Sequence, residues 1–161
     1  MHLHPYLAVS LSDQRPPQAV LTEFVRILRP GGGVMLYTAV TTPRLEPSER
    51  AWFLDALEAP RWWNLGRSPI DHAIKEAGLD VVAFETKSPE YSEALMAVDT
   101  DEISEQLCRV AQMRRARSKL EQALGASWYE RWLAWSHWQL YLILGKIETA
   151  AWMLRKPPTS S

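Results

Sequence analysis

The sequence contains a single cysteine, Cys108, among its 161 residues. One cysteine cannot form an internal disulfide, and a small apolar residue on a helix explains it more simply than a catalytic thiol does. We therefore expect a reducing, cytoplasmic location.

The sequence also lacks an excess of charge of one sign, because it has 18 basic and 19 acidic residues and a net charge of −1. The chain as a whole does not attract nucleic acid or an anionic membrane surface.

Long apolar runs are missing as well. The most apolar stretch, residues 132–144, is interrupted by Ser136, His137 and Gln139 and is shorter than the roughly 20 residues that span a bilayer. The first residues lack the basic stretch and apolar run of a secretory signal. With 47% hydrophobic and 23% charged residues, the composition is typical of one soluble globular domain without a transmembrane segment.

Glycine is scarce and is clustered only at Gly31–Gly33. Before this cluster, a short apolar strand over Tyr6–Ser10 and an amphipathic helix over Gln18–Leu28 are predicted. Pro30 and the glycines end that helix, and the apolar run Val34–Val40 follows as a strand covered on both faces. Strand, helix, glycine turn and strand make one βαβ unit.

The remaining sequence predicts more helices than strands. Ser68 and Pro69 are typical of a helix N-cap and first turn, and Gly78 ends that helix. Asp99 and Glu102 have the spacing of a capping box that begins one long helix, which Gly125 stops. The other expected elements are a helix over about 48–58, strands over 79–85 and 146–156, and a helix over about 128–142.

The stretch Leu21–Leu36, with its Arg-Ile-Leu-Arg-Pro-Gly-Gly core, resembles the segment that joins strands four and five of class I S-adenosylmethionine-dependent methyltransferases. Ala77-Gly78-Leu79 is similar to the start of that family's strand six, and a final strand ending Arg155-Lys156-Pro157 is similar to its strand seven. The resemblance implies an α/β fold, namely a partial Rossmann-like methyltransferase sheet with strands equivalent to 4-5-7-6. Its last strand would be antiparallel, and a helical lid would be inserted over about 90–142 of a single domain 1–157, before a polar tail 158–161.

Strands one to three of that family have no counterpart in the sequence. In the family, the glycine-rich turn after strand one and an acidic residue after strand two hold the cofactor. Gly31–Gly33 precede a strand rather than a helix, so they cannot replace that turn. We expect a truncated gene product, a mis-set start codon or half of a split enzyme. The strand Tyr6–Ser10 would then have an open edge, which favours a homodimer or association with a missing N-terminal half.

The resemblance also implies where the cofactor, S-adenosyl-L-methionine, would be approached. The loop after the family's strand four corresponds to Ser10, Leu11 and Ser12, which are the candidate cofactor-binding residues, although an ordinary polar loop explains them equally well. Methyl transfer from a sulfonium needs alignment of donor and acceptor and exclusion of water. We therefore expect no invariant catalytic side chain.

Aromatic residues are the candidates for acceptor binding. The sequence has eight tryptophans, and three of them recur at helical spacing, at positions 128, 132 and 135. Core packing is the simpler interpretation of this stripe, and the wall of an apolar acceptor pocket is the alternative. The candidate substrate-binding residues are Tyr37, Trp62, Trp63, Trp128, Trp132 and Trp135.

The remaining polar candidates have simpler explanations. His2 and His4 have a metal-ligand spacing, but a frayed terminus is the simpler interpretation and no metal site is expected. His72 and His137 are single helical histidines, for which a general-base role is the less favoured interpretation. The only basic cluster comprises Arg114, Arg115, Arg117 and Lys119, and it is interpreted as a solvated helix face rather than a nucleic-acid site.

Three functional hypotheses follow. The first is methyl transfer to a small, apolar organic acceptor, with this chain as the acceptor-binding half. The second is a non-catalytic interaction module derived from a methyltransferase, in which the open edge or the long helix 99–124 holds a partner. The third is peripheral membrane attachment through the aromatic helix 128–142.

Overall fold

The computed structural model of the chain describes residues 7–10, 16–59, 66–90 and 100–158, which divide into two compact units. Described residues within Met1–Val40, Pro60–Thr86 and Thr149–Ser161 form the sheet unit. Those within Thr41–Ala59 and Lys87–Glu148 form the helical unit. The expectation of a single domain with an insertion over about 90–142 stays a prediction.

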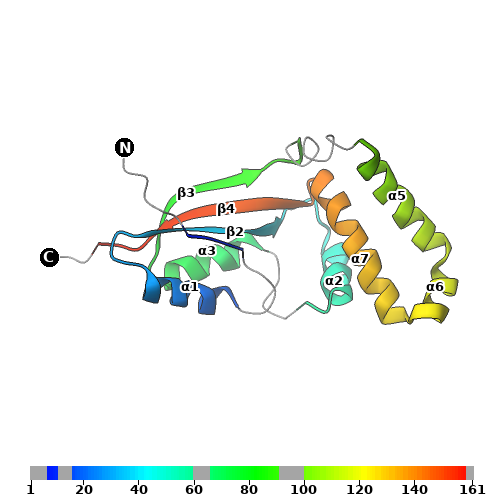
Figure 1. The fold of residues 1–161 in the computed structure, drawn as a ribbon, viewed down its shortest axis with the longest axis horizontal. Coiled ribbons are helices and arrows are strands. Elements are labelled where there is room, and N and C mark those ends of the chain that lie inside the picture. Colours follow the sequence, from blue (N-terminus) through cyan, green and yellow to red (C-terminus); the bar gives the residue numbers. More distant parts are fainter. Residues whose placement is uncertain (1–6, 11–15, 60–65, 91–99, 159–161) are drawn as a thin grey trace. The chain divides into compact units, whose positions relative to one another are not determined.

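The sheet contains four strands, β1 (Leu7–Ser10), β2 (Gly33–Thr41), β3 (Asp80–Lys87) and β4 (Ile147–Arg155), in the order β1-β2-β4-β3 (Figure 1). Strands β1 and β2 are parallel, with Leu7 opposite Val34 and Ser10 opposite Tyr37. Strand β4 is antiparallel to β2, because Lys156 N–H donates to Gly32 (2.9 Å) at one end and Thr42 N–H donates to the Lys146 carbonyl (3.0 Å) at the other. The expected 4-5-7-6 arrangement with an antiparallel last strand is therefore confirmed.

Helices α1 (Pro17–Ile27) and α3 (Arg67–Glu76) pack together on one face of this sheet (Figure 1). Their buried side chains meet alternate residues of β2 and β4, in which Leu36, Trp152 and Leu154 are fully buried. The indole N–H of Trp152 donates to Asp71 of α3 at 2.9 Å, so its one polar group is satisfied. This dry interior explains the nearly continuous apolar character of the β2 sequence.

The turn between α1 and β2 has the form that its proline and glycines predict. Gly31 adopts a φ of +76°, and a Cβ atom on Gly32 would lie 2.8 Å from the Arg29 carbonyl oxygen. Lys156 completes the end of α1, because its ammonium donates to the carbonyls of Val25 (2.6 Å) and Leu28 (2.9 Å). The Pro-Gly-Gly segment is therefore structural, since it ends one helix and returns the chain to the sheet.

The predicted start of α3 is wrong by two residues. Gly66, in extended conformation, is the N-cap, and Ser68 lies inside the helix without capping it. Arg67 begins the helix because its guanidinium donates to Asp71 at 3.1 Å and lies 3.8 Å from the centre of the Phe84 ring. Pro69 is tolerated because the first helical residues have no intrahelical acceptor for an N–H group.

The helical unit contains α2 (Pro47–Ala56), α5 (Thr100–Arg115), α6 (Arg117–Leu124) and α7 (Ala126–Ile143). One continuous helix up to Gly125 was expected, but Ala116 breaks it, with φ −92° and ψ 12°. The break lets both α5 and α6 pack against α7, where Tyr129 is 1% exposed beside Val110 and Met113. Gly125 does end α6, at φ +90°. The predicted cap Asp99 lies outside the described residues.

No helix in the described part of the chain is long and apolar enough to cross a membrane.

Candidate functional site

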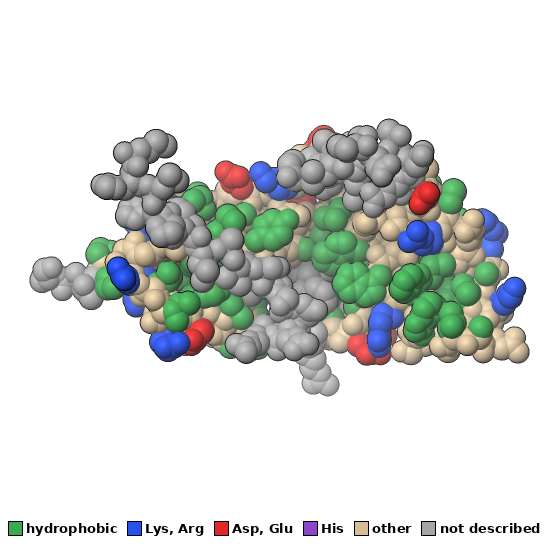
Figure 2. Space-filling model, in the orientation of Figure 1, with side chains coloured by type: hydrophobic (Ala, Val, Ile, Leu, Met, Phe, Trp, Pro, Cys, Tyr) green, Lys and Arg blue, Asp and Glu red, His purple; other side chains and the backbone are tan. Residues whose placement is uncertain are grey.

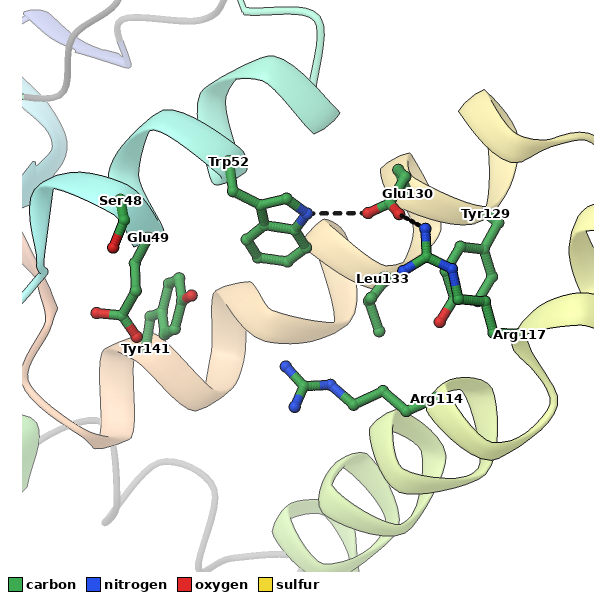
Figure 3. Close-up of a pocket in the computed structure, with 9 residues that line it drawn as sticks. All are labelled: Ser48, Glu49, Trp52, Arg114, Arg117, Tyr129, Glu130, Leu133 and Tyr141. Atoms are coloured by element: carbon green, nitrogen blue, oxygen red, sulfur yellow. Dashed lines mark hydrogen bonds and ion pairs between the residues drawn. The ribbon is translucent and has the colours of Figure 1, made fainter.

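A cavity of about 550 Å³ lies within the helical unit, between α2, α7 and the junction of α5 with α6 (Figure 3). This volume lies in the range that is typical of small-molecule sites. The lining combines aromatic rings with charged groups and comprises Ser48, Glu49, Trp52, Arg114, Arg117, Tyr129, Glu130, Leu133 and Tyr141.

A carboxylate–ammonium pair fixes one wall of the cavity. Glu49 is the third residue of α2, and its side chain accepts the backbone N–H of Glu46 at 3.1 Å in a capping box. The same carboxylate accepts a hydrogen bond from the Lys146 ammonium, which lowers the pKa of Glu49. Nearby, burial raises the pKa of Tyr141 to about 12, so its phenol stays neutral at physiological pH. The Lys146 ammonium therefore compensates the negative charge of Glu49.

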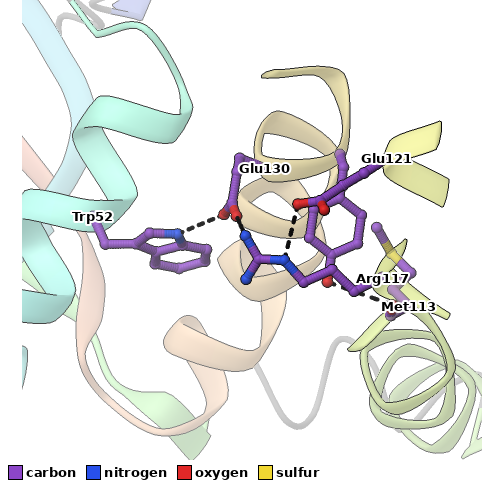
Figure 4. A network of polar contacts seen from close by, with 6 residues as sticks. Trp52, Met113, Arg117, Glu121 and Glu130 are labelled. Atoms are coloured by element: carbon purple, nitrogen blue, oxygen red, sulfur yellow. Dashed lines mark hydrogen bonds and ion pairs between the residues drawn. The ribbon is translucent and has the colours of Figure 1, made fainter. Parts of the chain in front are cut away.

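A second network orients the indole of Trp52 (Figure 4). Glu130 accepts the Trp52 indole N–H at 2.9 Å and the Arg117 guanidinium at 2.8 Å. Arg117 also donates to Glu121 at 2.9 Å, and this hydrogen bond raises the pKa of the Arg117 guanidinium. The indole of Trp52 on α2 is thus hydrogen-bonded to the Glu130 carboxylate on α7, and Arg117 compensates the charge of that carboxylate.

Arg114 reaches the cavity from the last turn of α5 (Figure 3). Its guanidinium lies 3.2 Å from Nε2 of His137, and Nδ1 of His137 lies 2.7 Å from the Leu133 carbonyl oxygen. Because a guanidinium and a carbonyl can only donate and accept respectively, His137 carries its proton on Nδ1 and accepts on Nε2. Burial lowers the pKa of His137, which is 6% exposed, so the neutral form is favoured.

Two of the sequence-predicted site residues come together in the sheet unit. Ser10 is the last residue of β1, and its Cα partner in β2 is Tyr37. Tyr37 is 46% exposed, on the side of β2 that the helices do not cover. The ends of parallel strands are where open α/β sheets bind ligands. The other predicted residues Leu11, Ser12, Trp62 and Trp63 lie outside the described part of the chain.

The interpretation of the three helical tryptophans as core is wrong. Trp128, Trp132 and Trp135 are 42%, 46% and 53% exposed, and the rings of Trp128 and Trp132 stack with centroids 5.3 Å apart. Figure 2 shows hydrophobic side chains at the surface in the region of α7. None of the three lines the cavity. Their role in acceptor binding stays a prediction.

The buried face of α7 lies about one residue further along the helix. Its side chains recur at helical spacing, as the tryptophans do, and are Tyr129, Leu133, Ala134, Ser136, His137 and Tyr141. Both stripes satisfy an amphipathic pattern, so periodicity alone could not choose between them. The sequence analysis consequently missed Tyr129 and Tyr141. It also missed Trp52, because no local sequence pattern in α2 distinguishes this residue.

The basic cluster is not merely a solvated face, since Arg114 and Arg117 line the cavity.

Cys108 is exposed on α5, which agrees with its predicted helical position. Among the residues that the structure describes, no three histidine, cysteine or acidic side chains are grouped to hold a metal ion. His2 and His4 are outside those residues.

Comparisons with known proteins give the fold and nothing more specific. No protein-family model and no curated protein sequence matches the chain. Solved structures do match. One, from Galdieria sulphuraria and provisionally assigned as a sarcosine dimethylglycine methyltransferase, superposes with a TM-score of 0.57 at 14% identity, covering 96% of this chain and 53% of that one.

Two further structures are similar. A mycolic acid cyclopropane synthase complexed with SAH and CTAB has a TM-score of 0.55 at 14% identity, over 96% of this chain and 57% of its own. A geranyl diphosphate methyltransferase in complex with SAM has a TM-score of 0.50 at 18% identity, over 94% of this chain and 53% of its own. The chain therefore has a methyltransferase fold and spans about half the length of these solved structures.

Proposed function

We propose that this chain is the acceptor-binding, C-terminal half of a cytoplasmic S-adenosylmethionine-dependent methyltransferase that acts on a small organic acceptor. One observation carries the proposal. The order β1-β2-β4-β3, with β4 antiparallel to β2, agrees with the 4-5-7-6 arrangement that the resemblance implies for strands four to seven, and this agreement supports the proposal. The structural likeness covers about half of each similar protein, which supports the same division.

The described residues do not form a complete cradle for the cofactor. A methionine-binding turn would join a strand to a helix N-terminus through glycines. The glycines with positive φ instead follow helices, at positions 31, 78, 125 and 145. Ser10 is the last residue of β1, at the carboxyl end of that strand. In this proposal the principal cofactor contacts belong to an N-terminal half that pairs with the edge of β1.

The acceptor's apolar part belongs in the cavity of the helical unit. Trp52, Leu133 and Tyr141 offer aromatic and aliphatic walls, and networks of charge-assisted hydrogen bonds hold the surrounding side chains. A rigid aromatic wall with a few convergent polar groups suits a small organic molecule. These lining residues replace the tryptophan stripe of α7 as the principal candidates.

Equilibrium dialysis with labelled S-adenosylmethionine tests the proposal on two proteins. One is this chain, and the other is the chain extended by any in-frame upstream sequence that encodes a strand followed by Gly-x-Gly-x-Gly. We expect the extended protein to bind the cofactor and the chain alone to bind much more weakly. Absence of such an upstream sequence, together with no binding by the chain at millimolar cofactor, would rule methyl transfer out.

A second candidate, a non-catalytic interaction module, is favoured by the exposed tryptophans of α7. Large apolar side chains gathered at a surface often mark a contact with another macromolecule. Trp128 and Trp132, together with the edge of β1, are the surfaces concerned. Sedimentation velocity decides this candidate, because a strictly monomeric chain at high concentration would argue against edge pairing. The variant Trp132→Ser would dissociate an assembly formed through α7.

A further inference from the structure

We propose that the cavity of the helical unit binds a small organic anion, whose carboxylate pairs with Arg114 and whose apolar body lies against Trp52 and Leu133. The identification of this anion as the methyl acceptor rests on the proposed function. The binding site itself rests only on the contacts within the helical unit. The acceptor, which the sequence predicts to be apolar, would then also carry a negative charge.

Arg114 differs from the other arginines of the helical unit that hold carboxylates. Arg117 is bonded to both Glu121 and Glu130, and Arg131 is bonded to Glu58. Among the described residues, the Arg114 guanidinium instead contacts the imidazole of His137. A guanidinium has five donors in a planar fork, which suits a bidentate carboxylate. One bond to a ring nitrogen leaves most of these donors for a ligand.

His137 positions Arg114 without neutralising it. The buried imidazole donates from Nδ1 to the Leu133 carbonyl at 2.7 Å and accepts from Arg114 at Nε2. Because the ring is neutral in this arrangement, the positive charge of Arg114 remains uncompensated by its partner. The ring also meets the edge of Trp52, with centroids 5.1 Å apart, which links the cation to the aromatic wall.

The acidic groups of the cavity are already paired. Glu49 is bonded to Lys146, and Glu130 is bonded to Arg117. The lining holds two carboxylates and two guanidiniums, and Arg114 is the guanidinium whose contact is a ring nitrogen and not a carboxylate. A ligand carboxylate can therefore pair with Arg114 without displacing an existing ion pair, whereas a neutral or cationic ligand gains no such pair.

The apolar half of the site is rigid. Glu130 fixes the Trp52 indole through a 2.9 Å hydrogen bond, and Leu133 is only 5% exposed. Figure 3 shows Arg114 extending below Trp52 and Leu133, so that its charged end and the apolar wall face the same space. An aryl or short alkyl carboxylate has the matching distribution of charge and apolar surface.

Two isosteric probes test the inference, phenylacetate and phenylacetamide, titrated into the full chain without cofactor. The readout is the indole N–H resonance of Trp52 in a nitrogen–proton correlation spectrum, assigned with Trp52→Phe. We expect phenylacetate to shift this resonance saturably, with an affinity at least about tenfold above that of phenylacetamide.

Variants at neighbouring positions identify the cation. Arg114→Gln should weaken phenylacetate binding about tenfold or more, Arg114→Lys should retain part of it, and Arg115→Gln on the exposed side of α5 should leave it unchanged. Circular dichroism checks that each variant is folded. Arg114→Lys keeps the test decisive if Arg114→Gln does not fold.

Equal affinity for the two probes, no shift with phenylacetate, or unchanged binding by folded Arg114→Gln would each overturn the anion site. Because no cofactor is present, these results are independent of methyl transfer. Saturable phenylacetate binding by an extended chain that fails to bind S-adenosylmethionine would keep the anion site and remove the methyltransferase proposal.

Discussion

The interiors of the two units differ in kind. In the sheet unit the buried side chains are almost all apolar, and Leu36, Trp152 and Leu154 are fully buried between the sheet and two helices. In the helical unit the buried groups include Ser136 and His137, and charged networks reach the cavity wall. The first interior depends on apolar burial, whereas the second combines apolar burial with hydrogen-bonded polar groups.

This difference separates the roles of the two units. Apolar burial is non-directional, so the sheet unit is a scaffold whose stability follows the apolar area that it buries. Hydrogen bonds are directional, so the polar interior of the helical unit fixes the orientations of Trp52, Arg114 and Glu130 around a space for a ligand. The helical unit is therefore where specificity for a small molecule is to be sought.

The largest effect is expected from Trp152 in the sheet unit. Replacing it by Ala removes a fully buried ring and should lower the free energy of unfolding by about 3–5 kcal/mol. The matched control is Trp135→Ala on the exposed face of α7, which loses a contact with the Trp138 ring and should lower it by no more than about 1.5 kcal/mol. Urea denaturation followed by circular dichroism measures both. Comparable losses in the two variants would contradict the assigned burial.

A smaller and pH-dependent effect is expected from His137. His137→Leu removes the side-chain hydrogen bonds to the Leu133 carbonyl and to Arg114 and should cost about 1–3 kcal/mol near pH 7.5. Burial lowers the pKa of His137 in the folded state below the reference value of 6.5, so the unfolded state binds more protons as pH falls through that value. The neutral, buried His137 therefore stabilises the native protein above about pH 6.5, and this stabilisation is lost as the pH falls further.

The cost of His137→Leu should accordingly shrink between about pH 7.5 and pH 5. Arg114 and Lys146 lower the pKa of His137 as burial does, whereas the hydrogen bond to the Leu133 carbonyl and the charge of Glu49 raise it. Urea denaturation of both proteins at each pH gives the difference directly. A cost that grows as pH falls would mean that the histidine is protonated in the folded state.

The smallest effect of the three belongs to Lys156, which is a polar contact in the otherwise apolar sheet unit. Lys156→Met keeps the aliphatic stem but loses the two hydrogen bonds to the carbonyls of Val25 and Leu28 at the end of α1. A loss of about 1–2 kcal/mol in the free energy of unfolding is expected. Hydrogen exchange of the amides in the last turn of α1 would show whether the loss is local. Lys75→Met, at an exposed position of α3, is the control.

The elements of the sheet unit were largely predictable from the sequence. The Pro-Gly-Gly turn, the apolar strand after it and the final strand have local signals, because a proline, a positive φ or an alternating pattern is a property of neighbouring residues. The start of α3 was misplaced because Arg67 is held by Asp71 and by Phe84, which is distant in sequence.

The candidate site was much less predictable. Nothing near Trp52 in the sequence indicates its bond to Glu130, and the basic cluster gave no sign that Arg114 and Arg117 turn toward a cavity. The tryptophan stripe was the stronger apolar signal on α7, yet the tyrosine face is buried. Helical periodicity defines a face but not what that face meets.

Local sequence signals were sufficient to predict the order of the strands and helices, the turn at Gly31–Gly33 and, through the resemblance, the order of the sheet. Long-range contacts instead set which face of α7 is buried, where the helix after residue 100 breaks, and which arginine reaches the cavity with a neutral partner. The two groups of features differ in the range of the interactions that set them. Backbone conformation is set by adjacent residues, whereas burial and charge pairing depend on side chains that only folding brings together.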